Sequence, residues 1–298
     1  MGFFDKLFEK KECAICGGEI GLLGNRKLED GNMCKTCAAK LSPWFSDRRE
    51  STVEQIQEQL AYREANKAKV AAFNTTRTMG QNTKVLLDED AGVFMVTSAR
   101  DLEEANPDVL AFSDVTGCEL DIHESEREIK HDGPDGKQVS YNPPRYKYYY
   151  DFYVDIHVRN PYFDDIRFRL NNPSIEIEPP AMPGMGARPM AGRPGAPGRP
   201  GTPGRPGMEP RRGPAPGMRM ANMFASTKID PETDVDYRRY REMGEEIRDA
   251  LLQVRQQARD EMAAAAAPKA AVTCPYCGAT TTPDASGCCE YCGGAVNG

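Results

Sequence analysis

Residues 146–158, YKYYYDFYVDIHV, carry the pattern that decides the fold of this 298-residue chain. One set of alternate positions is aromatic or aliphatic throughout: Tyr146, Tyr148, Tyr150, Phe152, Val154, Ile156 and Val158. Because successive side chains of a strand point to opposite faces, this period of two predicts a strand with one apolar face. An aromatic row can also stack the bases of single-stranded nucleic acid, but complete alternation is what a sheet over a core requires.

Further strands are predicted on both sides of this stretch. They cover residues 84–87, 93–97, 115–122, 166–170 and 175–177, with a hairpin turn at 88–92. In the strand at 115–122, Cys118 shares a face with Leu120 and Ile122, which predicts a buried thiol rather than a nucleophile. We expect consecutive antiparallel strands that enclose a barrel or sandwich core.

Two amphipathic helices are predicted outside the strands. Apolar residues recur at near-helical spacing between Val53 and Phe73, which predicts a helix over 52–72. A second helix is predicted to begin at Asp230, an N-cap residue that Pro231 follows at the first helical position. Its apolar stripe consists of Tyr237, Tyr240, Ile247, Leu251 and Val254. Such a stripe needs a partner, so we expect this helix to pack on the strands.

The chain contains ten cysteines, most of them in Cys-x-x-Cys pairs. The pairs are Cys13/Cys16 and Cys34/Cys37 near the N-terminus, and Cys274/Cys277 and Cys289/Cys292 near the C-terminus. Residues 1–12 lack the apolar core and cleavage site of a signal peptide, so we expect a cytoplasmic protein. In that reducing compartment, paired spacings of this kind predict metal sites rather than disulfides.

The spacing predicts two structural Zn²⁺ ions, each held by four cysteines. Two intervening residues let one tight turn place both sulfurs about 2.3 Å from one ion. Four thiolates close the coordination sphere, so neither ion is expected to activate water. Cys288 is expected to be a spare thiol, since its use would lengthen the last pair by one residue. Iron in the same ligand sets and a redox dithiol are the alternatives.

A segment of strongly biased composition separates the last predicted strand from the second helix. Residues 192–206 form five Gly-X-Pro triplets, with Arg193, Arg199 and Arg205 at every sixth position. Five triplets are too few for a collagen triple helix, so we expect a flexible linker whose arginines make at most weak contacts with acidic partners. The whole chain carries a net charge of −7 despite these arginines. A duplex-binding surface on the folded parts is therefore disfavoured.

No arrangement of residues predicts catalysis. The three histidines, His123, His131 and His157, lie in unrelated contexts, without a Ser/His/Asp set, a phosphate-binding loop or paired carboxylates. We therefore expect that the protein is not an enzyme. No apolar run approaches the roughly 20 residues that span a bilayer, so no transmembrane segment is expected.

Several further motifs lie along the chain outside the predicted strands: the opening residues 1–8, the pairs Cys13/Cys16 and Cys34/Cys37, Asn66, Phe73, Thr76, and the Tyr-rich segment that ends in Gly-Glu-Glu-Ile247. Together they resemble a bacterial family with an N-terminal zinc-knuckle domain of unknown function. The resemblance extends to about Asn172 and resumes from Tyr237 to Val254. The resemblance implies that the middle domain is similar to a pleckstrin-homology domain, a small barrel capped by a helix.

The sequence thus predicts an α+β protein in which a small antiparallel β-barrel capped by a helix lies between two zinc modules. The predicted order is an N-terminal zinc-knuckle domain (1–48), a linking helix (50–80), an antiparallel strand domain (81–178), a disordered Pro/Gly/Arg-rich insert (179–229), a helix that packs on the strand domain (230–262), an Ala-rich tether (263–272) and a C-terminal zinc ribbon (273–298).

The predicted function is that of a non-catalytic interaction or scaffold protein. Its expected partner is a protein or a lipid surface. Nucleic-acid binding through the zinc modules is an alternative, because Arg26, Lys27, Lys35 and Lys40 make the first module locally basic. A thiol-based redox regulator is the other alternative. The oligomeric state is left open.

Overall fold

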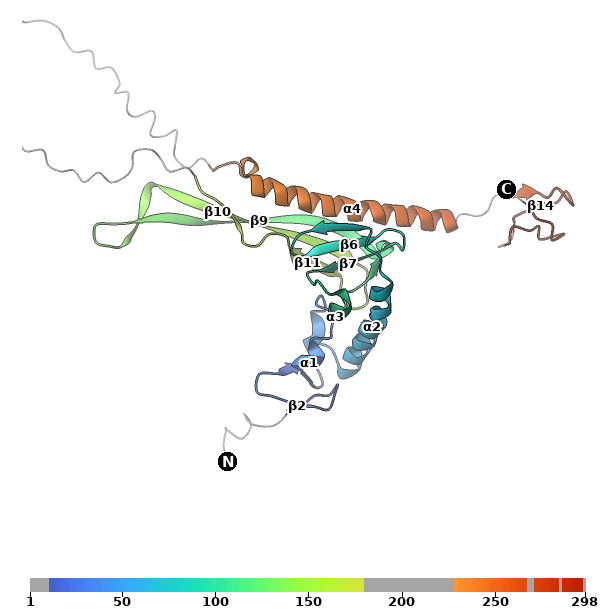
Figure 1. The fold of residues 1–298 in the computed structure, drawn as a ribbon, viewed down its shortest axis with the longest axis horizontal. Helices are drawn as coiled ribbons and strands as arrows, with labels where there is room; N and C mark the ends of the chain where they lie inside the picture. Colours follow the sequence, from blue (N-terminus) through green and yellow to red (C-terminus); the bar gives the residue numbers. More distant parts are fainter. Residues whose placement is uncertain (1–10, 180–227, 267–270, 284–285, 297–298) are drawn as a thin grey trace, which may run out of the picture. The chain divides into compact units, whose positions relative to one another are not determined.

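A computed structural model describes residues 11–179, 228–266, 271–283 and 286–296. The chain combines helices with antiparallel sheets (Figure 1). It forms two compact units, one from the described parts of 1–120, 154–168 and 243–298, and the other from those of 121–153 and 169–242. Residues 1–8 of the family resemblance and the predicted insert, apart from residues 179, 228 and 229, lie outside the described residues.

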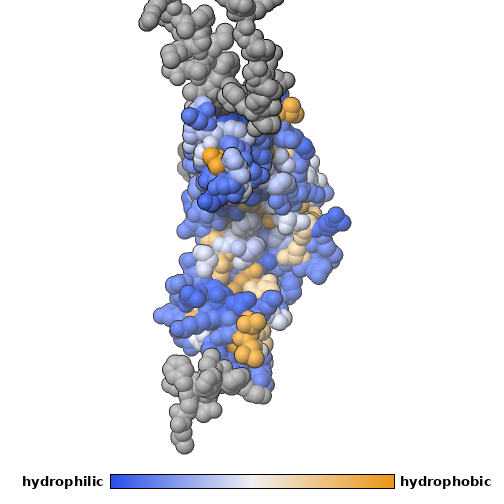
Figure 2. All heavy atoms as spheres, turned by 90° about the vertical axis from the view of Figure 1, so that its left-hand side faces the viewer, coloured by the Kyte–Doolittle hydropathy of each residue, from blue (hydrophilic) through white to orange (hydrophobic). Residues whose placement is uncertain are grey.

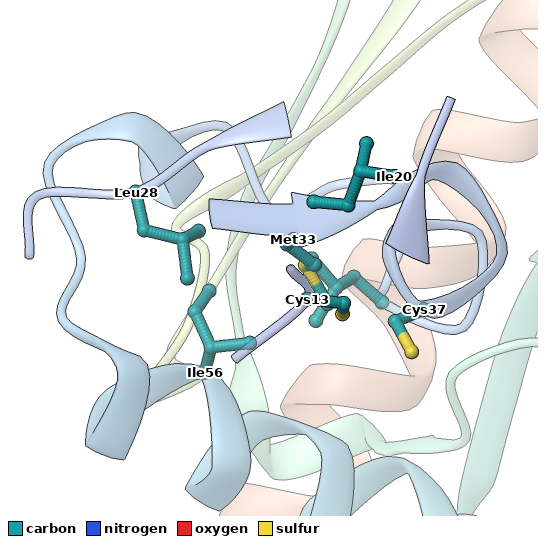
Figure 3. Close-up of a cluster of buried hydrophobic side chains, with 7 residues drawn as sticks. Cys13, Ile20, Leu28, Met33, Cys37 and Ile56 are labelled. Carbon is teal, nitrogen blue, oxygen red and sulfur yellow. The ribbon is translucent and has the colours of Figure 1, made fainter. Parts of the chain in front are cut away.

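The first unit opens with two small hairpins. They pair β1 (Lys11–Glu12) with β2 (Glu19–Ile20) and β3 (Asn25–Lys27) with β4 (Asn32–Cys34), and α1 (Lys35–Ala38) follows directly. Buried Ile20, Leu28 and Met33 form a small core with Cys13 and Cys37, and Ile56 points into it from the following helix (Figure 3). Domains with so small an apolar core usually need a disulfide, a metal ion or a partner for stability.

The predicted helix at 52–72 is α2 (Val53–Ala72). Thr52 caps it, because its hydroxyl accepts from the Gln55 N–H while the Gln55 side chain accepts from the Thr52 N–H, at 3.3 and 2.9 Å. This reciprocal pair satisfies two donors that would otherwise lack partners at the helix start.

A buried polar network joins α2 to the loop before β8 (Leu110–Ala111) and to the first module. Arg63 donates to the Asp108 carboxylate at 2.8 Å, and Ser42 donates to the other Asp108 oxygen at 2.8 Å. The Asn66 amide donates to Asn106 Oδ1 at 2.8 Å, and its oxygen accepts from the Val109 N–H at 3.0 Å. Because Asp108 binds both Ser42 and Arg63, and Asn66 binds both Asn106 and Val109, these hydrogen bonds fix the positions of segments that are far apart in the sequence.

The first sheet is an antiparallel meander in the order β5-β6-β7-β8. Its other strands are β5 (Arg77–Gly80), β6 (Lys84–Asp88) and β7 (Val93–Thr97), and the short helix α3 (Leu102–Ala105) lies between β7 and β8. Leu86 and Met95 on one face pack with Val70 of α2. Their neighbours Val85, Leu87 and Phe94 on the opposite face are also buried, so the sheet is covered on both sides.

The second sheet is built around a long hairpin of β9 (Val115–Asp132) and β10 (Gln138–Val158). Both strands are longer than predicted. Alternate residues of β10 are buried only from Tyr150 onward, whereas Gln138–Tyr149 is exposed or half-buried. Residues 138–145 lack a regular apolar alternation, so periodicity could not reveal that part of the strand, whereas Tyr146 and Tyr148 continue the alternation but are only half-buried.

Two short strands, β11 (Asp165–Arg169) and β12 (Ile175–Ile177), both pair with β10. Between them, the buried Asn171 side chain accepts from the Phe152 N–H and donates to the Tyr150 carbonyl, each at 2.9 Å. The amide thus replaces a backbone partner where the two short strands are interrupted.

The second predicted helix begins later than expected. Asp230 caps a 3₁₀ turn (Pro231–Thr233), and α4 (Val235–Ala266) starts after Asp234, whose carboxylate accepts from the Tyr237 N–H at 2.9 Å. Because α4 runs to Ala266, it includes the first residues of the predicted Ala-rich tether.

Helix α4 packs on the second sheet within each unit. The Tyr237 ring lies edge-on to Tyr150 and Phe152, with centroids 5.0 and 5.1 Å away. Further along, a Cβ on Gly244 would lie 2.4 Å from Leu120, so glycine permits the close approach of the helix there. Among the described helices, none combines the length and apolar character that a membrane crossing requires.

The prediction of a closed barrel is wrong for the described strands, which form two separate four-stranded sheets and three two-stranded ones. In the described ranges, the edges of the two four-stranded sheets do not pair with each other: β9, β11 and β12 pair only with β10, and β5 and β8 pair only within their own sheet. A barrel requires that its edges pair.

Candidate metal centres

The four N-terminal cysteines meet at one point. The sulfur atoms of Cys13, Cys16, Cys34 and Cys37 all lie within 4.8 Å of one another, and the Cys16 and Cys34 sulfurs are 3.9 Å apart. Cys13 and Cys37 are buried beside Met33 and Ile20 (Figure 3). Cys16 is exposed. The group therefore lies at the rim of the small apolar core.

The Cys13–Cys16 turn has a defined backbone geometry. The Cys13 N–H donates to the Gly18 carbonyl at 2.9 Å, and the Gly17 N–H donates back to the Cys13 carbonyl at 2.8 Å. Gly17 has a φ of 71°, a left-handed conformation that residues with a Cβ rarely adopt. The glycine after the second cysteine is therefore part of the turn that directs both sulfurs to one side.

Cys34 and Cys37 are placed in another way, at the start of α1. Cys34 is the N-cap residue, and its sulfur accepts from the Cys37 N–H at 3.3 Å. The Cys34 N–H in turn donates to the Cys13 sulfur at 3.2 Å. This pair has no following glycine because a helix terminus directs its sulfurs instead, and backbone N–H groups at such a terminus favour thiolates.

The C-terminal cysteines form a second group with the same backbone turn used twice. The sulfurs of Cys274, Cys277, Cys289 and Cys292 lie within 4.8 Å of one another. Gly278 and Gly293 have φ of 71° and 69°, and each donates to the carbonyl of the first cysteine of its pair. The hairpin of β13 (Val272–Thr273) and β14 (Thr280–Thr281) carries the first pair, and Cys288 forms a bridge with Ala295 beside the second.

The sulfur separations fit one tetrahedral ion in each group. A Zn–S distance of about 2.3 Å corresponds to sulfurs about 3.8 Å apart at the corners of a tetrahedron. The separations are 3.9 Å for Cys16–Cys34, 3.6 Å for Cys274–Cys292 and 3.7 Å for Cys277–Cys289. A disulfide requires about 2.05 Å, and all ten cysteines are free. These donor sets fit zinc, with every ligand position filled by protein.

The electrostatics of the thiols also favour a bound cation. Burial acts to raise the pKa of Cys13, but the N–H groups of Cys34, Cys16 and Ile15 outweigh it and lower that pKa to about 6. By contrast, burial and then the neighbouring cysteine sulfurs raise the pKa of Cys37 to about 12. The backbone N–H groups of the turns therefore stabilise the Cys13 thiolate. The Cys37 thiol stays protonated beside that negative charge until a bound cation offsets it.

The remaining sequence candidates lie outside these groups. Cys288 belongs to neither group, since Cys289 is the residue that joins the other three. Cys118 is buried in β9, and burial raises the pKa of its thiol to about 12. His157 contacts Asp165 at 2.5 Å, and the His131 ring lies tilted against Tyr141 with centroids 4.7 Å apart. The sequence did not reveal that the Cys34 and Cys37 N–H groups donate to cysteine sulfurs, because the direction in which a backbone N–H points depends on the folded conformation.

Comparison with known proteins identifies one similarity. Residues 11–59 match a family model described as a domain of unknown function (DUF4428). The match spans the first four-cysteine group and the start of α2, including Ile56 of the module core. No curated protein and no solved structure matches the chain. The first module is therefore similar to a domain that has no assigned function.

Proposed function

We propose that this protein is a non-catalytic interaction protein whose two structural zinc modules present binding surfaces to a partner protein. Each four-cysteine group would hold one Zn²⁺ that replaces a larger apolar core. The ion would hold the turns of each module in place. Because four thiolates leave no open position, the ions would support binding rather than chemistry.

Exposed apolar side chains on the modules carry this proposal. Leu22 and Leu23, in the turn between β2 and β3, are 84% and 92% exposed. In the second module Tyr276 and Tyr291, each just before the second cysteine of its pair, are 73% and 72% exposed. Figure 2 shows one face of the molecule, where hydrophilic residues cover most of the surface and hydrophobic ones form small separate groups. Large exposed side chains on a fixed turn are suited to contact with another protein.

The same proposal includes the architecture and the compartment. Two antiparallel sheets followed by a helix that packs on one of them is an element order consistent with a pleckstrin-homology-like domain. Cysteine pairs with metal-site spacing rather than disulfides are typical of a reducing compartment, which supports the proposal of a cytoplasmic protein.

Site-specific photocrosslinking tests the proposal in cells. A benzophenone amino acid at position 276 of the full chain should crosslink a defined protein, and the additional Tyr291→Ser substitution should reduce that product while the zinc content stays constant. The matched control carries the benzophenone at position 139, where Val139 is also exposed. Identical products from positions 276 and 139, or products unaffected by Tyr291→Ser, would contradict the proposal.

A further inference from the structure

A cleft of about 650 Å³ in the first unit has an unusual lining. Its walls come from the segment that leads into α2, from α2 itself and from the turn between β10 and β11. The volume is within the range of small-ligand sites, roughly 300–1,000 Å³, and exceeds what one side chain fills. The cleft involves neither four-cysteine group.

Aromatic side chains form one part of the lining. Trp44, Phe45 and Tyr162 are each half-buried, so part of each ring faces solvent. The rings of Phe45 and Tyr162 are perpendicular with centroids 6.4 Å apart, and Tyr162 also contacts Tyr62 with centroids 5.1 Å apart. These contacts fix the orientation of the Tyr162 ring. Exposed aromatic faces attract cations, and arginine, whose planar guanidinium group stacks on the ring, is the commonest partner.

Every charged residue in the lining is acidic: Asp47, Glu58, Asp164 and Asp165. Asp165 contacts His157 at 2.5 Å, and Asp47 accepts from the Ser46 hydroxyl at 2.7 Å. Within the described part of the chain, the carboxylates of Glu58 and Asp164 have neither an ion-pair nor a hydrogen-bond partner. Burial, and then the charge of Glu58, raises the pKa of Tyr162, which places Glu58 near that ring. Negative charge and aromatic faces thus meet in one cleft.

The backbone that carries these groups is held in place. The Asn160 side chain accepts from the Tyr162 N–H at 3.0 Å and donates to the Tyr62 hydroxyl at 3.0 Å. The Asp164 carbonyl accepts from the Val158 N–H at 2.7 Å. The turn is therefore ordered before any ligand arrives, which lowers the entropy cost of binding.

We propose that this cleft binds an arginine-containing basic segment of a partner protein. A guanidinium group can stack on an aromatic face and donate two hydrogen bonds to a carboxylate at once, whereas an ammonium group cannot donate in that planar arrangement. Trp44 and Tyr162 supply the faces, and Glu58 and Asp164 supply the unpaired acceptors. The inference is independent of the tyrosines on the zinc modules.

Trp44 provides a direct test because it is the only tryptophan of the chain. An octapeptide of alternating glycine and arginine is titrated into the full zinc-loaded chain while Trp44 fluorescence is recorded. We expect a saturable change that weakens at high salt. The lysine counterpart should bind more weakly, and the glutamine counterpart should not bind.

Variants locate the site. Glu58→Gln and Asp164→Asn should each lower the affinity roughly two- to fivefold, which is the range for exposed ion pairs. Glu54→Gln, on the same helix but outside the cleft, should leave it unchanged, and an unaltered circular dichroism spectrum and zinc content verify the fold of each variant. No fluorescence response, equal binding of the lysine or glutamine peptide, or equal effects of Glu58→Gln and Glu54→Gln would overturn the inference.

Discussion

Replacing one cysteine in each group should remove one ion and leave the other. Cys13→Ser takes a buried sulfur from the first group, and Cys274→Ser takes one from the second. We expect two Zn²⁺ per unmodified chain and one in each variant. Cys288→Ser is the matched control, because it removes a thiol beside the second group without removing a ligand, and it should retain both ions.

The structure also predicts the metal–sulfur distance. In a regular tetrahedron the edge is about 1.63 times the distance from centre to corner, so the three separations of 3.6–3.9 Å correspond to sulfurs about 2.2–2.4 Å from the ion, and the other pairs lie within 4.8 Å. The apparent binding free energy of structural zinc, about 10–16 kcal/mol in small peptides, also stabilises the fold. Loss of the first ion should therefore unfold the first module. The fluorescence of Trp44 should then change, because Trp44 lies only three residues after Leu41, which is part of the module core.

Elemental mass spectrometry on protein purified without added metal gives the ion count, and X-ray absorption at the zinc edge gives ligand type and distance. Four sulfur ligands at about 2.3 Å, without nitrogen or oxygen, are expected. A chain that contains iron or no metal would refute the reasoning. So would a Cys13→Ser variant that keeps two ions, or a fitted shell that includes nitrogen.

Three other predictions concern the fold and the two thiols outside the four-cysteine groups. Asp108→Ala leaves the buried Arg63 without its carboxylate partner and should lower the free energy of unfolding of the first unit by about 3–5 kcal/mol, measured in urea. Glu64→Ala, which removes the partner of an exposed ion pair with Lys67, should lower it by less than about 0.5 kcal/mol. Equal losses in the two variants would contradict this prediction. Gly80 has a φ of 88°, and a Cβ at this position would lie 2.4 Å from the Thr83 carbonyl oxygen. Gly80→Ala should therefore lower the melting temperature of the protein by an amount equivalent to about 1–3 kcal/mol. An unchanged melting temperature would contradict the predicted strain. Iodoacetamide at mildly alkaline pH should alkylate the partly exposed Cys288 and not Cys118, because burial raises the pKa of the Cys118 thiol to about 12. Peptide mapping identifies the alkylated residue, and alkylation of Cys118 in the folded chain would contradict its burial.

Local patterns in the sequence predicted the elements that have a buried face. The alternation from Tyr150 to Val158 appears in β10 as alternate burial, and the helix expected at 52–72 is α2. The cysteine spacing predicted which thiols come together, because two Cys-x-x-Cys pairs at this separation are the ligand pattern of a four-cysteine metal site. The predicted helix start at Asp230 was wrong, because Asp230 caps only the 3₁₀ turn and Asp234 caps α4.

The sequence by itself therefore determined the two four-cysteine groups, the apolar strand and the helix at 52–72, since spacing and periodicity along the chain reveal each of them. Tertiary structure alone decided that the strands form two open sheets, that Arg63 meets Asp108, and that Asn171 completes the pairing of β10. It also decided that Trp44, Glu58 and Asp164 line one cleft. These contacts join residues that are distant in the chain, and periodicity and spacing carry no information about which distant surfaces meet.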